Sequence, residues 1–95
     1  MMARRARPKP DEVISVCYGI HPATKEVATI FVRRNGSYSV GNHTYSNQHN
    51  LPIEAEVNII HGIEVEFCVP VYQMNDENTR EMVAALKDRA GRLKE

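Results

Sequence analysis

The stretch IEAEVNIIHGIEVEF, residues 53–67, alternates apolar and polar residues almost without interruption. Alternation with a period of two is typical of a strand with one buried face. A three-residue loop at 60–62 joins the two halves into an antiparallel hairpin, with Gly62 in the left-handed conformation that such a loop requires. In this register Val57 pairs with Val65, and the apolar side chains share one face. This hairpin decides the predicted fold.

The same register gathers four carboxylates on the opposite face of the hairpin, which are Glu54, Glu56, Glu64 and Glu66. No Lys or Arg lies between Arg34 and Arg80 to neutralise them. Like charges directly opposite each other destabilise a strand pair by a few tenths to about 1 kcal/mol. The face is therefore solvated, kept for a basic partner, or neutralised by the N-terminal arm or the C-terminal helix. A divalent-metal site is a further alternative, although no metal-ligand loop is present.

Three strands precede this hairpin, at 12–20, 27–34 and 37–42, where β-branched and aromatic residues concentrate. Asn35-Gly36 between the second and third strands predicts a type I′ turn, which requires positive φ at both residues. An uncharged loop follows over 41–50.

A helix capped by Asn75 or Asp76 ends the chain. Its apolar residues recur at spacings of three and four and are predicted to pack on the sheet: Met82, Val83, Leu86, Ala90 and Leu93.

These elements predict an α+β fold. An antiparallel sheet of about five strands, a three-stranded meander plus the hairpin, carries one C-terminal helix packed on one face. Ninety-five residues suit one domain. We assign residues 1–11 to a flexible basic N-terminal arm and 12–95 to the single α+β domain.

Two cysteines are too few for a disulfide framework, and no apolar run reaches the ~18 residues of a membrane span. A cytoplasmic protein with reduced cysteines and no contact with a membrane is expected, with one disulfide bridge as the alternative. Cys17, His21, His61 and Cys68 have no common zinc spacing, so neither a metal nor a cofactor is predicted.

The sequence lacks a nucleophile elbow and a glycine-rich phosphate loop, and a Glu–His pair that includes His49 has no further support. We therefore predict a small non-enzymatic binding or regulatory protein, of adaptor or inhibitor type. It would bind a protein partner with a basic surface through the acidic face, an open sheet edge, or both. A homodimer formed through a sheet edge is also compatible with this interpretation.

Nucleic-acid binding is the alternative function, because basic arms and hairpins contact phosphates and an aromatic side chain can stack on a base. The near-neutral pI of about 6.9 is unfavourable to it. The candidate residues for this alternative are Arg4, Arg5, Arg7, Lys9, Arg33, Arg34 and Tyr38.

Overall fold

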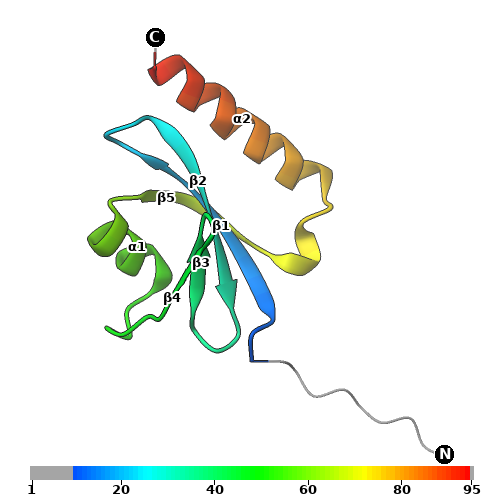
Figure 1. The fold of residues 1–95 in the computed structure, drawn as a ribbon. Helices are drawn as coiled ribbons and strands as arrows, with labels where there is room; N and C mark the ends of the chain where they lie inside the picture. The colour runs from blue at the N-terminus through cyan, green and yellow to red at the C-terminus, as the bar shows by residue number, and fades with distance from the viewer. Residues whose placement is uncertain (1–9, 95) are drawn as a thin grey trace, which may run out of the picture.

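A computed structural model describes residues 10–94 and contains a five-stranded antiparallel sheet with a helix against each face (Figure 1). The strand order is β4-β3-β2-β1-β5, which leaves β4 and β5 as the two edges. The predicted α+β class, the five-stranded antiparallel sheet and the C-terminal helix are confirmed. The elements in chain order are β1 (Val13–His21), β2 (Glu26–Arg33), β3 (Tyr38–Val40), β4 (His43–Tyr45), α1 (Ile53–His61), β5 (Glu64–Pro70), the 3₁₀ helix η1 (Val71–Gln73) and α2 (Glu77–Leu93).

The predicted meander of β1, β2 and β3 is confirmed, but the turn between β2 and β3 is not of type I′. Only Gly36 has a positive φ there, of 90°. The Arg33 N–H donates to the Ser37 carbonyl at 2.9 Å, so the loop contains three residues. The predicted loop at 41–50 is also shorter, because β4 begins at His43 and pairs with β3.

The prediction of a hairpin over residues 53–67 is wrong, because 53–61 form helix α1. A helical period also accommodates this segment, since Ile53, Val57 and Ile60 are four and three residues apart. The helix places Glu54 and Glu56 in its first turn, where the helix dipole favours negative charge. A hairpin would instead have opposed glutamates across two strands.

Gly62 does adopt the predicted left-handed conformation, with φ 70°, but as the C-cap of α1. Its N–H donates to the Asn58 carbonyl at 3.1 Å, and the Ile63 N–H donates to the Val57 carbonyl at 3.2 Å. The last carbonyls of the helix are thereby satisfied. The chain then turns into β5, which pairs with β1 instead of with residues 53–61.

The pairing of β5 with β1 contains an irregularity and a close backbone approach. Tyr18 pairs with Phe67 and Gly19 with Val65, so Glu66 is the extra residue of a β-bulge. A Cβ atom at Gly19 would lie 2.4 Å from the Glu64 carbonyl oxygen. Only glycine fits at this position.

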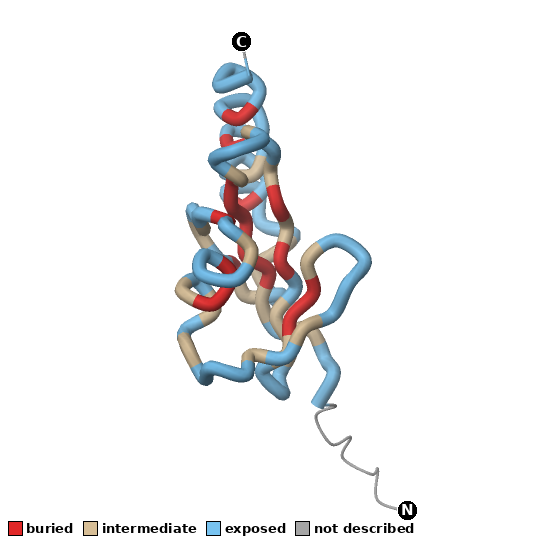
Figure 2. Tube along the Cα trace, turned by 60° about the vertical axis from the view of Figure 1, so that its left-hand side comes forward, coloured by how far each residue is buried: buried red, intermediate tan, exposed pale blue. Residues whose placement is uncertain are grey.

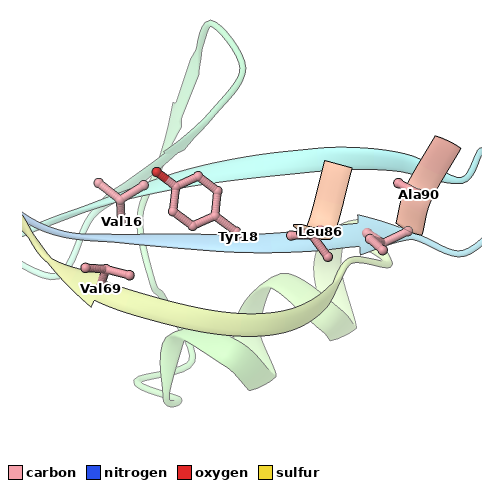
Figure 3. Close-up of a cluster of buried hydrophobic side chains, with 6 residues drawn as sticks. Val16, Tyr18, Val69, Leu86 and Ala90 are labelled. Atoms are coloured by element: carbon pink, nitrogen blue, oxygen red, sulfur yellow. The ribbon is translucent and has the colours of Figure 1, made fainter. Parts of the chain in front are cut away.

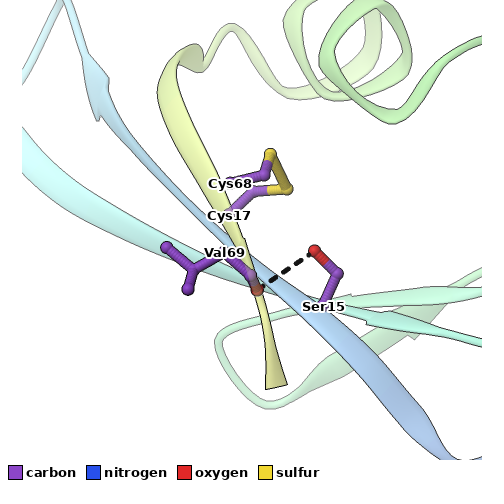
Figure 4. The surroundings of a disulfide bond; sticks show 4 residues. All are labelled: Ser15, Cys17, Cys68 and Val69. Carbon is purple, nitrogen blue, oxygen red and sulfur yellow. Dashed lines mark hydrogen bonds between the residues drawn. A yellow bond between two sulfur atoms is a disulfide. The ribbon is translucent and has the colours of Figure 1, made fainter. Parts of the chain in front are cut away.

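The register also brings Cys17 opposite Cys68, and a disulfide joins them (Figure 4). The prediction of reduced cysteines is therefore wrong in this structure. The two residues are 51 positions apart and meet only through the β1–β5 pairing, which the predicted hairpin did not contain. Cys17 is 1% exposed, whereas Cys68 is exposed.

Each face of the sheet has its own buried cluster. Buried positions lie on the strands and on the helices (Figure 2). On the α2 face, Leu86 and Ala90 pack against Val16, Tyr18 and residues beside them (Figure 3). Met82 and Leu93, which were predicted to belong to the buried stripe of the helix, are 45% and 49% exposed, because the stripe runs through Thr79, Val83, Leu86 and Ala90. On the α1 face the buried residues of the hydrophobic cluster are Cys17, Ala28, Ile30, Tyr38, Val57 and Ile63.

Part of the predicted N-terminal arm lies against the β2–β3 turn, since the Pro10 carbonyl accepts a hydrogen bond from the Asn35 N–H at 2.8 Å. The remainder of the arm, residues 1–9, lies outside the described residues. Within residues 10–94, neither helix combines the length and apolar character needed to cross a membrane.

Candidate functional site

The four glutamates predicted to share one face are dispersed over the molecule, because α1 replaces the first strand of the hairpin. Glu54 is exposed on α1, and Glu64 is exposed at the start of β5. Glu66, at the β-bulge, forms an ion pair with Arg89 of α2. One alternative for the predicted acidic face was that the C-terminal helix neutralises it. This is the case for Glu66. Glu56 is buried, and the candidate site forms around it.

Glu56 and Tyr38 meet between helix α1 and strand β3. The Tyr38 hydroxyl donates a hydrogen bond to Glu56 Oε2 at 2.7 Å. Tyr38 is 0% exposed and Glu56 is 2% exposed. The other carboxylate oxygen, Glu56 Oε1, is also buried and has no hydrogen-bond partner among residues 10–94. Burying such an oxygen without a partner costs about 1–3 kcal/mol, and more for a charged group.

His61, the last residue of α1, extends this network. Its Nε2 atom lies 3.0 Å from the Tyr38 hydroxyl oxygen. Because the single hydroxyl proton of Tyr38 is donated to Glu56, the contact requires a proton on His61 Nε2. The edge of the His61 ring meets Tyr45, with 4.5 Å between the ring centroids, and Tyr45 stacks on Tyr38 at 5.6 Å. The geometry therefore forms a chain from imidazole to phenol to carboxylate.

The surroundings of Tyr38 keep its phenol protonated. Burial is the largest cause that raises the pKa of Tyr38 above its usual value of 10.0, followed by the hydrogen bond to Glu56 and the charge of Glu56. Removing the phenolic proton would place a second negative charge next to a carboxylate in a region with little water. Tyr38 therefore acts as a hydrogen-bond donor at neutral pH.

A pocket of about 200 Å³ opens beside this network, and we call it the Glu56 pocket. Glu56 and Ile60 contribute from α1, where a spacing of four residues places both on one side of the helix. Tyr38 contributes from β3. The remaining lining residues are Tyr45, Ser46, Gln48 and His49, from β4 and the segment after it. His49 and Glu56 line the same pocket, but within residues 10–94 no hydrogen bond joins them.

The three described residues among those predicted for nucleic-acid binding do not form one exposed surface. Tyr38 is buried and cannot stack on a base. Arg34 pairs with Glu12 at 2.8 Å, and Arg33 is half-buried. The arm residues Arg4, Arg5, Arg7 and Lys9 lie outside the described part of the chain.

Among residues 10–94, no group of three or more His, Cys, Asp or Glu side chains is placed to hold a metal ion. Cys17 and Cys68 are joined to each other. No cofactor is implied by the residues that line the Glu56 pocket.

The participation of Tyr38 and His61 was not predicted from the sequence. From the sequence, Tyr38 was a candidate for stacking on a base and His61 belonged to the predicted hairpin loop. The available signal was the spacing of Ile53, Val57 and Ile60, because a helical interpretation of it brings Glu56 and His61 onto the element that covers β3.

In comparisons with known proteins, no family model, no curated protein and no solved structure matches this chain. The chemistry of the site is therefore the basis for a functional assignment.

Proposed function

We propose that this protein is a non-enzymatic binding module that takes a basic side chain of a protein partner, Lys or Arg, into the Glu56 pocket. The observation that carries the proposal is the buried oxygen Glu56 Oε1, which has no hydrogen-bond partner among residues 10–94. An ammonium or guanidinium group would supply both the missing hydrogen bond and a compensating charge.

The lining of the pocket suits a cation. Tyr45, which is half-buried, provides aromatic surface, and none of the seven lining residues is Lys or Arg. Positive groups are attracted to aromatic faces by about 0.5–2 kcal/mol. A volume of about 200 Å³ is smaller than the roughly 300–1,000 Å³ typical of small-molecule sites. It therefore suits the end of one side chain better than a whole ligand.

The surface beside the pocket favours a protein partner. Ile60 lines the pocket and is 48% exposed, and Ile59 next to it is 65% exposed. Buried charge contacts surrounded by apolar residues are typical of the energetic centre of a protein interface. An adaptor, regulatory or inhibitory role follows by analogy with other small binding domains.

The raised pKa of Tyr38 supports binding more than catalysis. A general acid or base works best with a pKa near the operating pH, whereas burial and Glu56 shift the pKa of Tyr38 away from neutrality. The Tyr38 hydroxyl thus serves to orient Glu56.

The proposal is tested with three capped peptides that differ at one position, which is Arg, Lys or the uncharged norleucine. In an NMR titration we expect the Arg and Lys peptides to shift the amide signals of residues 45–49 and 56–60 saturably, and the norleucine peptide to shift none.

Glu56→Gln keeps an acceptor for Tyr38 but removes the charge, so the affinity for the Arg and Lys peptides should fall about tenfold or more, equivalent to about 1.4 kcal/mol.

A matched pair of variants on α1 separates the pocket from general electrostatics. Ile60→Lys places a competing ammonium at the pocket and should abolish peptide binding, whereas Ile59→Lys adds the same charge outside the lining and should leave binding unchanged. Circular dichroism confirms that both variants are folded. Equal shifts with the norleucine peptide, or full binding by Ile60→Lys, would refute the proposal.

A further inference from the structure

A second groove lies on the opposite side of the sheet, along one flank of α2, and contains an accessible phenolic hydroxyl. It has a volume of about 360 Å³. Tyr18 of β1 lines it and is 7% exposed as a residue (Figure 3 shows Tyr18 beside α2). Its hydroxyl forms no hydrogen bond within residues 10–94 and is not among the fully buried atoms there, so it is accessible to a ligand. Burial raises the pKa of Tyr18, so the hydroxyl remains a protonated donor at neutral pH.

The groove combines an apolar surface with positive charge at its rim. Met74 and Val83 provide apolar lining, and the exposed residues Arg80 and Lys87 belong to the same flank of α2, seven residues apart. Within residues 10–94, neither cation forms an ion pair with an acidic side chain.

The other flank of the same helix shows that this arrangement is not a general property of α2. A groove of about 350 Å³ lies there, lined by Glu66, Met82, Arg89 and Arg92 among others. Both of its cations are compensated within the protein, since Arg89 pairs with Glu66 and Arg92 pairs with Asp88 at 3.1 Å. The two flanks thus differ in whether their positive charges already have an anionic partner.

We propose that the groove of Tyr18, Arg80 and Lys87 binds a small amphiphilic carboxylate, an aliphatic chain that ends in a single acid group. The Tyr18 hydroxyl donates to a carboxylate oxygen, Arg80 and Lys87 neutralise the charge, and the chain covers Met74 and Val83. The volume is at the lower end of the roughly 300–1,000 Å³ found for small-molecule sites. The site is separate from the Glu56 pocket, because the two lie on opposite faces of the sheet.

Three probes of equal chain length test the required chemistry: octanoate, octanol and octylammonium. By NMR titration and calorimetry we expect saturable octanoate binding with shifts at Tyr18, Val83 and Ala84, weaker binding of octanol and no binding of octylammonium.

Tyr18→Phe removes only the hydroxyl and should weaken octanoate binding about tenfold, as expected for a hydrogen bond to a charged group.

A charge-reversed pair on α2 provides the matched control. Lys87→Glu should weaken octanoate binding about tenfold or more and leave octanol binding unchanged. Lys94→Glu makes the same change of net charge outside the groove and should bind octanoate within about twofold of the unmodified protein, which corresponds to less than about 0.5 kcal/mol. Equal binding of octanoate and octanol, equal effects of the two reversals, shifts confined to other residues, or the absence of saturable binding would each overturn the proposal.

Discussion

The two faces of the sheet are held by different kinds of contact. On the α2 face, Leu86 and Ala90 of a 17-residue helix pack against Val16 and Tyr18, and the ion pair between the sheet and the helix is peripheral. On the α1 face, a helix of nine residues is attached through Val57 and through the hydrogen bond between Tyr38 and Glu56, beside a disulfide. The α2 helix is held mainly by apolar burial, whereas α1 is also held by a directional hydrogen bond, next to a disulfide that links strands β1 and β5.

This difference determines what each face tolerates. The stabilisation that comes from burying apolar side chains has no preferred direction and is roughly proportional to the buried area. The α2 face should therefore accept other apolar residues of similar volume. A hydrogen bond between buried groups requires both partners, and the loss of one leaves the other without compensation. Helix α1 is shorter than the ~12–15 residues at which isolated helices become stable. Its order therefore depends on its contacts with the sheet.

The largest loss of stability is expected when the disulfide of the α1 face is reduced. Cys17 and Cys68 close a loop with a sequence separation of 51, and in the chain-entropy model a bridge of this span stabilises the native state by about 4 kcal/mol. We expect reduction to lower the free energy of unfolding, measured in urea with and without dithiothreitol, by about this amount.

The double variant Cys17→Ala and Cys68→Ala is the control for this measurement. Its stability should be unaffected by dithiothreitol and should resemble that of the reduced protein. An unmodified protein whose urea midpoint is the same under both conditions would contradict the assignment of a stabilising bridge to this face.

On the α2 face the largest effect is expected from Leu86, which is 4% exposed. Leu86→Ala removes buried methyl groups and leaves a cavity, so the free energy of unfolding should fall by about 3 kcal/mol. Met82→Ala, on the same helix but at a position that is 45% exposed, should cost less than about 1 kcal/mol. Equal losses for the two variants in urea unfolding would mean that α2 does not pack as described.

The same contrast explains how much of the fold could be predicted. The helix over 77–93 was predicted because Val83, Leu86 and Ala90 repeat its period over several turns, beyond an acidic N-terminal turn. The meander was predicted because β-branched residues concentrate in its strands and Asn35-Gly36 separates two of them. In both regions, the apolar residues that form the periodic pattern in the sequence are mostly the residues that the fold buries.

Residues 53–61 could not be assigned in this way, because nine residues satisfy both a strand period and a helix period. The choice depends on a contact outside the segment, since only the helix presents Glu56 to Tyr38, 18 residues earlier. Gly62 was correctly predicted to be left-handed, but this conformation serves a hairpin loop and a helix C-cap equally well. The candidate site was missed for the same reason, because a glutamate predicted to be exposed is its buried centre.

The smallest of the three effects tests whether the polar contact stabilises the α1 face. Tyr38→Phe preserves the ring and removes the donor to Glu56, which should lower the free energy of unfolding at pH 7 by about 1–3 kcal/mol. Tyr45→Phe makes the same chemical change where the hydroxyl has no hydrogen bond within residues 10–94, and should cost less than about 0.5 kcal/mol.

The dependence of this loss on pH identifies its cause. The folded protein raises the pKa of Tyr38 above 10.0 through burial and Glu56, so the protonated phenol is favoured by folding. The stabilisation is complete below the unfolded pKa of about 10 and decreases as the pH rises from there through the folded pKa. The gap between the unmodified protein and Tyr38→Phe should therefore be constant at neutral pH and narrow above pH ~10. A gap that stays constant into that range would assign the loss to packing and would remove the hydrogen bond from the contacts that hold α1 on the sheet.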